Sequence, residues 1–179
     1  MLKNEIEIPA GVNVSLADGR LTVKGKKGEA SKVFVNPMLG MSLEGSKIVI
    51  TSPNERKKVR AIVTTWETLV RNMFKGTEKS WKAELKLVYS HFPIKLKVDK
   101  GRLLIDNFLG EKSPRSVPIP SDIKVELDQS LIKVSGHDKE RVGQLCGRIE
   151  QTTRIRGYDK RVFQDGLYIT RKPYLEGEE

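Results

Sequence analysis

The sequence predicts an α+β protein made of two tandem copies of one small domain, each with antiparallel strands packed around one main helix. An internal repeat is the first observation: Gly19-Arg20-Leu21 recurs as Gly101-Arg102-Leu103, and residues 46–52 recur, 83 positions on, as residues 129–135. An amphipathic helical pattern that recurs with the same 83-residue spacing is the second. Repeats of this length indicate duplicated domains and not a solenoid. We therefore expect an N-terminal domain over residues 1–80 and a C-terminal domain over residues 81–179.

The strands of the first copy follow from alternation. Apolar side chains alternate over residues 12–16 and again over residues 21–23, on either side of Asp18-Gly19. An Asp-Gly pair between alternating segments is typical of a tight hairpin. Residues 47–51 predict one more short strand.

A helix is expected directly after that strand. Ser52-Pro53-Asn54-Glu55 combines an N-cap serine, a first-turn proline and a capping-box glutamate. Gly76 predicts the end of the helix. The apolar face consists of Val59, Ile62, Val63, Trp66, Leu69, Val70 and Met73.

The second copy repeats this plan. Asp99-Lys100-Gly101 predicts the hairpin turn, and Ser135-Gly136-His137-Asp138 weakly repeats the helix start. Alternating residues predict strands over 81–89, 92–98, 103–105, 123–127 and 131–135. The helix face that corresponds to that of the first copy consists of Val142, Leu145, Cys146 and Ile149.

Composition narrows the class of partner. The 179 residues hold 33 Lys and Arg against 23 Asp and Glu, a net charge of +10, which favours a polyanion such as nucleic acid or an acidic membrane surface. No apolar run approaches the roughly 18 residues of a spanning helix, and residues 1–12 lack the layout of a signal peptide. The single cysteine excludes an internal disulfide and indicates a reducing, intracellular setting.

The copies diverge at the end of the helix. Leu69 and Val70 become Thr152 and Thr153, and the chain turns basic beyond them. Residues 156–168 interleave basic side chains with aromatics and glycines. Cationic groups neutralise phosphates, and aromatic rings stack on unpaired bases. A solvated loop whose aromatics anchor it to the core explains the same composition, and both interpretations stay open on composition alone.

The other candidate sites are weak. The basic segment Lys24-Gly25-Lys26-Lys27-Gly28 lacks P-loop spacing and is better read as a basic hairpin loop with a minor RNA contact. His91 and His137 lie in different regions, and one cysteine leaves too few soft ligands for zinc. Cys146 occupies the position of Val63 on a buried face, so we expect a core residue. We predict no catalytic residues, no metal and no cofactor.

The chain resembles the large-ribosomal-subunit protein L-six family in its archaeal form. The resemblance covers essentially the whole chain and rests on residues 6–12, 21–29, 89–93 and 155–169. The proline-, lysine- and glycine-rich signature of the bacterial branch is absent near the C-terminus, so its contacts are not transferred.

The resemblance implies a structural, cytoplasmic ribosomal protein without catalytic activity. Its expected partners are large-subunit ribosomal RNA, bound mainly through the second domain, and neighbouring ribosomal proteins. The resemblance also implies a place near the sarcin-ricin loop and near the region where translational GTPases dock, and no membrane partner. His91 is expected to be structural or to touch RNA. The RNA-facing positions that the resemblance implies are Arg154, Arg156, Tyr158, Lys160, Arg161, Arg171 and Lys172.

Two other classes of function remain open on the sequence. One is a free nucleic-acid-binding module that acts outside the ribosome. The other is an enzyme such as an RNA-modifying factor. A ribosomal role predicts co-sedimentation with the large subunit, a free module a slowly sedimenting pool, and an enzyme a cofactor-dependent turnover.

Overall fold

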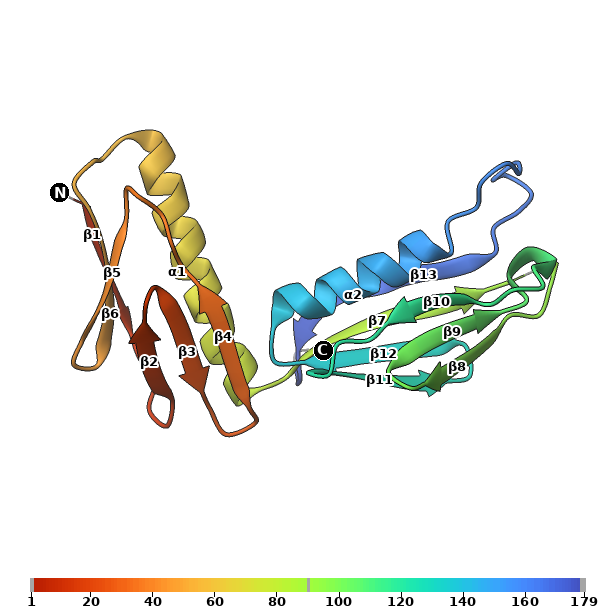
Figure 1. The fold of residues 1–179 in the computed structure, drawn as a ribbon, viewed down its shortest axis with the longest axis horizontal. Helices are drawn as coiled ribbons and strands as arrows, with labels where there is room; N and C mark the ends of the chain where they lie inside the picture. Colours follow the sequence, from red (N-terminus) through yellow and green to blue (C-terminus); the bar gives the residue numbers. More distant parts are fainter. Residues whose placement is uncertain (1, 90, 178–179) are drawn as a thin grey trace. The chain divides into compact units, whose positions relative to one another are not determined.

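The computed structural model describes residues 2–89 and 91–177, and it divides the chain into two compact units, Met1–Ser80 and Trp81–Glu179 (Figure 1). Each unit holds antiparallel sheets and one main helix, which confirms the predicted α+β duplication. Ser90, in the family-like stretch 89–93, lies outside the described residues.

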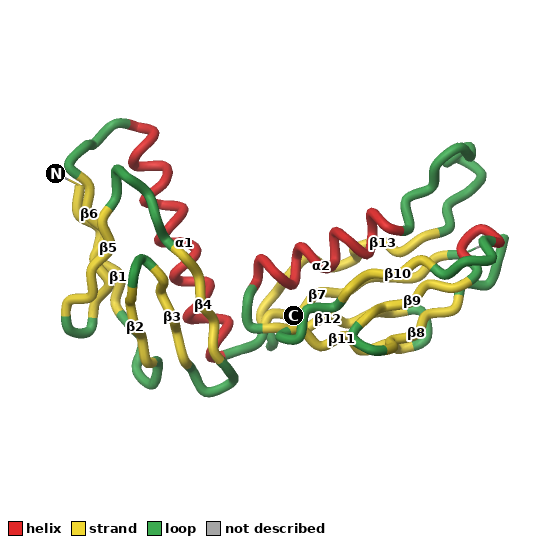
Figure 2. The backbone as a smooth tube through the Cα atoms, in the orientation of Figure 1, coloured by secondary structure: helices red, strands yellow, loops and turns green. Residues whose placement is uncertain are grey.

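The first unit has two three-stranded antiparallel sheets and one long helix (Figure 2). The sheet orders are β1-β6-β5 and β2-β3-β4. The elements are β1 (Leu2–Glu7), β2 (Asn13–Ala17), β3 (Arg20–Lys24), β4 (Glu29–Val33), β5 (Gly40–Glu44), β6 (Lys47–Ser52) and α1 (Lys57–Glu78).

Local sequence explains most of this unit. Asp18 and Gly19 both have positive φ, 49° and 72°, as a two-residue hairpin turn with right-handed twist requires. The predicted helix face is buried, except that Ile62 and Leu69 lie at its half-buried border. Trp66 packs edge-on against Phe34, with ring centroids 5.4 Å apart.

The predicted start of the first helix is wrong. Ser52 is the last residue of β6, paired with Leu2, and its hydroxyl donates to the Met38 carbonyl at 3.0 Å. Because the strand ladder and this bond hold Ser52, the helix begins later, at Lys57, without a side-chain cap on Arg56. The capping motif is thus overridden by a neighbouring strand.

The predicted helix end at Gly76 is also wrong. The helix runs on to Glu78, and Gly76 and Thr77 are buried. The Thr77 hydroxyl donates back to the Met73 carbonyl at 3.1 Å, and the Lys27 N–H donates to the Thr77 carbonyl at 3.1 Å. The hairpin loop therefore supplies a hydrogen-bond donor to the last turn of the helix, and the helix continues past the glycine that was expected to end it.

The second unit adds a strand to the same plan. Its sheets have the orders β11-β12-β7-β13 and β10-β9-β8. The sequence predicts no strand after the second helix, yet β13 pairs antiparallel with β7. The elements are β7 (Trp81–Val88), β8 (Lys95–Asp99), β9 (Arg102–Asp106), the short 3-10 turn η1 (Phe108–Gly110), β10 (Arg115–Pro118), β11 (Ile123–Asp128), β12 (Leu131–Gly136), α2 (Lys139–Thr152) and β13 (Gly166–Leu175).

One detail of the predicted repeat is corrected by the strand register. Ile48 and Ile50 of β6 belong to the first core, whereas Ile132 and Val134 of β12 belong to the second. These positions are 84 residues apart, not 83. A slip of one residue would turn every side chain of the strand to the opposite face. The helix faces keep the predicted spacing of 83, with Val63 and Cys146 both buried.

Candidate nucleic-acid interface

Residues 153–165 form a loop that joins α2 to β13, and this loop carries the basic and aromatic segment. Thr153 fixes its start: the buried hydroxyl accepts a hydrogen bond from the Leu167 N–H at 3.0 Å and donates to the Glu150 carbonyl at 3.2 Å. Ile155 is buried in the second core and anchors the chain two residues on. The loop is therefore tied to the domain at its helical end.

A short turn shapes the tip of the loop. The side-chain carboxylate of Asp159 accepts from the Arg161 backbone N–H at 2.9 Å. The backbone carbonyl of Asp159 accepts from the Phe163 N–H, also at 2.9 Å. The ring of Tyr158 lies 4.8 Å from that of Phe163, and 52% of the tyrosine is exposed. One side of the Tyr158 ring therefore packs against Phe163, and the rest of the ring is open to solvent.

His91 and Asp165 brace the other end. Asp165 is 1% exposed, and its carboxylate accepts from the His91 backbone N–H at 3.2 Å and lies 3.0 Å from His91 Nδ1. The His91 ring stacks on Phe163 with centroids 4.4 Å apart. His91 therefore supports the loop from beneath, which agrees with the structural interpretation; contact with RNA stays a prediction.

Five of the predicted RNA-binding residues are brought together on this loop, and all five are exposed: Arg154, Arg156, Tyr158, Lys160 and Arg161. Two hollows of about 300 and 240 Å³ lie beside them. Lys160 and Tyr168 line the larger one, Arg156 lines the smaller one, and Arg154 lines both.

Arg115 is a neighbour that sequence reasoning missed. It lines the smaller hollow together with Arg154 and Arg156. Its guanidinium donates to the Thr152 carbonyl at the end of α2 and to the Glu111 carboxylate, and it lies 4.2 Å from the centroid of the Phe108 ring. Because Arg115 and Thr152 are 37 residues apart in the sequence, no local sequence pattern indicates that they meet. Arg115 stabilises the helix end from which the loop departs.

Arg171 and Lys172 are not part of the loop cluster. They lie in the middle of β13, five or more residues beyond its start, which is about 16 Å or more of strand. The Arg171 guanidinium lies 3.7 Å from the centroid of the Tyr174 ring, and Arg171 lies opposite Glu84 in the register of β13 and β7. Any RNA contact of these two residues is therefore separate from that of the loop.

The basic hairpin loop of the first unit is docked on the last turn of α1. A Cβ atom added at Gly25 would lie 2.6 Å from the Thr77 carbonyl oxygen, so only glycine permits this approach. Lys24 forms an ion pair with Glu29 at 3.2 Å. Lys26 and Lys27 project from a fixed loop, and a minor RNA contact there stays a prediction.

Among the remaining candidates, Cys146 lies in the second core, as predicted. Cys146 is 1% exposed, and burial raises the pKa of its thiol to about 11, which disfavours the nucleophilic thiolate. Within residues 2–89 and 91–177, no three His, Cys, Asp or Glu side chains are grouped as metal ligands. Neither helix in that part of the chain is long and apolar enough to cross a membrane.

The fold and the loop define a class of protein. A duplicated α+β fold that presents guanidinium, ammonium and phenol groups from one braced loop is typical of basic proteins that bind nucleic acid through phosphates and unpaired bases.

Comparison with known proteins narrows the class to a family. The family model described as ribosomal protein L6 matches residues 8–80 and 92–166, one match in each unit. The chain therefore belongs to the ribosomal protein L6 family. This confirms the resemblance noted in the sequence, and the proteins of this family are not enzymes.

Several archaeal relatives align over nearly the whole chain. Large ribosomal subunit protein uL6 of Methanothrix thermoacetophila is 42% identical over 167 residues, which cover 93% of this chain and 95% of that protein. The proteins of the same name from Natronomonas pharaonis and Haloarcula marismortui are each 40% identical, and each alignment covers at least 96% of both chains.

Proposed function

We propose that this protein is a structural constituent of the large ribosomal subunit in the cytoplasm, and that its second domain binds large-subunit ribosomal RNA through the loop of residues 153–165. One observation supports the assignment of the loop above all others. The five exposed basic and aromatic residues of the loop share a scaffold fixed by Thr153 at one end and by the His91–Asp165 pair at the other.

The residue types fit distinct tasks at an RNA surface. Arg154, Arg156 and Arg161 offer planar forks that bind phosphates or base edges in two-point fashion. Lys160 adds a point charge. Tyr158 presents an open ring to an unstacked base. A preformed loop loses little conformational entropy on binding, so more of the contact energy appears as affinity.

The family resemblance supports a finer location. We place the protein near the sarcin-ricin loop and beside the region where translational GTPases dock. In this arrangement the second domain holds the RNA in position, and neighbouring ribosomal proteins complete its surroundings. The protein itself needs no cofactor for this role.

Sucrose-gradient fractionation combined with RNA footprinting tests the proposal. The tagged protein should sediment with the large subunit at moderate salt and should protect nucleotides at the sarcin-ricin loop or next to it. A slowly sedimenting pool would indicate a free nucleic-acid-binding module. Co-sedimentation with protection at a distant site would overturn the location and keep the ribosomal role.

A further inference from the structure

The strands β1 and β7 hold equivalent places in the two units, but over residues 2–89 and 91–177 β7 pairs on both sides and β1 on one side. Ile6 of β1 pairs with Ile48, and Leu85 of β7 pairs with Ile132, the counterpart of Ile48. In the second unit β13 covers the other edge of β7. In the first unit, as far as residues 2–80 show, the sheet ends at β1.

The contacts of β13 show what the covered edge requires. Leu167 and Ile169 lie opposite Leu87 and Leu85 and pack against the second core. The Ile169 N–H donates to the Glu150 carboxylate of α2 at 3.1 Å. A strand in this position is therefore held by the edge of the sheet and by the helix together.

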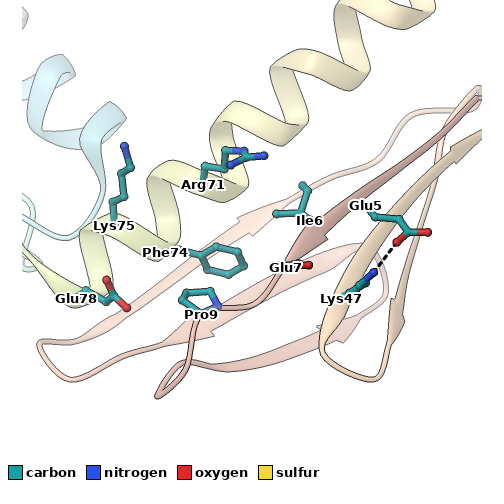
Figure 3. Close-up of a pocket in the computed structure, with 9 residues that line it drawn as sticks. All are labelled: Glu5, Ile6, Glu7, Pro9, Lys47, Arg71, Phe74, Lys75 and Glu78. Atoms are coloured by element: carbon teal, nitrogen blue, oxygen red, sulfur yellow. Dashed lines mark hydrogen bonds and ion pairs between the residues drawn. The ribbon is translucent and has the colours of Figure 1, made fainter.

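In the first unit the same position is a groove of about 550 Å³ between β1 and α1 (Figure 3). Glu67 is the counterpart of Glu150, 83 residues earlier. Its carboxylate accepts from Asn4 Nδ2 at 2.7 Å and from the Arg71 guanidinium at 2.8 Å instead of from a strand. Ile6, Pro9 and Phe74 give the groove an apolar wall.

The backbone of β1 is oriented to accept another strand. The Ile8 N–H donates to the Ser46 carbonyl at 2.9 Å, on the side of β6. Because the N–H and C=O groups of an antiparallel strand alternate in direction, those of Lys3, Glu5 and Glu7 are directed to the open edge. The equivalent alternation in β7 directs the Glu84 carbonyl toward β13, where it accepts from the Thr170 hydroxyl at 3.1 Å.

The charges around the groove select the chemistry of a guest. Lys47 is neutralised by Glu5 at 2.9 Å and Arg71 by Glu67. Among the ionised residues that line the groove, this leaves Glu7 and Glu78 against Lys75. With Arg71 paired to Glu67, the groove carries a small acidic excess in a protein of net charge +10, and this excess favours a basic peptide over an RNA backbone.

We propose that the open edge of β1 and the groove beside α1 bind an extended, basic segment of a neighbouring protein of the large subunit, which adds to the sheet as an antiparallel strand. Apolar side chains at alternate positions of the guest contact Pro9 and the exposed edges of the core residues Ile6 and Phe74, and a Lys or Arg between them faces Glu7. Addition of a strand to an exposed sheet edge is a recurrent mode of peptide recognition. The partner is a ribosomal protein only if the proposed function holds.

Photo-crosslinking within assembled particles tests this proposal. Benzoylphenylalanine replaces Glu7 or Glu78 in the full-length protein, with Thr65 on the exposed face of α1 as the matched control. Large subunits that contain the protein are purified before irradiation, so a failure to enter the subunit is scored separately, against the proposed function. Mass spectrometry then maps the linked peptides.

The expected result is that both groove positions link to one extended, basic segment of one ribosomal protein, and that Thr65 does not. Glu5→Pro removes an edge-directed N–H that the sheet of the first unit does not use, so it should lower the yield from position 78 about fivefold or more. Glu5→Ala controls for the lost carboxylate. Thermal unfolding of both variants verifies that the unit stays folded.

Several results overturn the proposal. Links from Glu7 and Glu78 to RNA, to a helix, to several unrelated proteins or to a second copy of this chain would do so, as would no links at all in assembled subunits. An undiminished yield in a folded Glu5→Pro protein would exclude strand addition as the binding mode.

Discussion

The two units share one plan but differ beyond the middle of the helix. The helix of the first unit has 22 residues, whereas that of the second has 14. In the first unit the helix runs on to Glu78, and β1 is the edge of its sheet among the described strands. In the second the helix stops at Thr152, a basic loop follows, and β13 closes the edge of β7.

The exchange of Val70 for Thr153 shows how the difference arises. Val70 is a fully buried apolar residue of a continuing helix. Thr153 is also buried, but the helix of the second unit ends just before it, at Thr152. Its hydroxyl accepts from the Leu167 N–H and so attaches the returning strand β13 to the end of the helix. A duplicated scaffold can thus gain a basic surface loop from a few polar substitutions at one helix end.

The largest expected effect concerns RNA affinity. Replacement of Arg154, Arg156 and Arg161 by glutamine should weaken binding to large-subunit RNA by at least about a hundredfold, because three charge-assisted contacts are lost. The log–log salt slope should fall by up to about one unit per lost phosphate contact. Binding titrations at several salt concentrations measure both quantities.

The matched control replaces Lys24, Lys26 and Lys27 of the first unit by glutamine. It removes the same charge and should change affinity far less. Equal losses of affinity in the two triple variants would contradict the RNA-binding role of the loop and would favour its interpretation as a solvated surface loop.

The next largest effect concerns the brace of the loop. Asp165→Ala removes the carboxylate that accepts from the His91 backbone N–H and that faces the His91 ring. The second unit should therefore lose about 2–3 kcal/mol of unfolding free energy. Denaturant unfolding of residues 81–179 measures the loss. Asp128→Ala, at an exposed carboxylate, serves as the control and should change stability by less than about 0.5 kcal/mol. A wild-type stability of Asp165→Ala would show that the loop is not braced at this point.

A reciprocal exchange sharpens the comparison of the helix ends. Thr153→Val leaves the buried Leu167 N–H without its acceptor and should cost the second unit about 1–2 kcal/mol. Val70→Thr should cost the first unit less, because its hydroxyl can donate to a carbonyl one turn back, as Thr64 and Thr68 do. Hydrogen exchange resolved by unit measures both. A larger loss for Val70→Thr would contradict the assigned role of Thr153.

The smallest effect concerns Cys146. Cys146→Val should change stability by about 1 kcal/mol or less near neutral pH and leave RNA binding intact.

An unfolded chain ionises this thiol near the ordinary pKa of 9.0, whereas burial raises the pKa of the folded thiol to about 11. Native stability should therefore fall as the pH rises between these values, and the valine variant should lack that part of the fall. Unfolding titrations of both proteins and the rate of alkylation near pH 7 measure these effects; rapid alkylation of the native thiol would contradict its burial.

Features that depend on neighbouring residues could be predicted from the sequence alone. The turn at Asp18-Gly19, the buried faces of both helices and the core position of Cys146 all follow from local conformational preference and from periodicity. The basic and aromatic composition of residues 154–161 was equally visible. The turn and the helix faces recur in both copies because the same packing problem is solved twice, whereas the basic segment belongs to the second copy.

Contacts between residues far apart in the sequence became visible only in the folded structure. Ser52 carries a helix-capping signal but ends a strand, because its pairing with Leu2 and its bond to Met38 outweigh a local cap. The His91–Asp165 pair joins residues 74 positions apart, and β13 finds its place beside β7 although no turn links the two strands. Pairing across such separations depends on which edges and buried polar groups remain unsatisfied after the local elements form. For that reason the sequence could identify the residues of the basic loop, while only the fold could show what braces the loop and which edge of the first unit is left open.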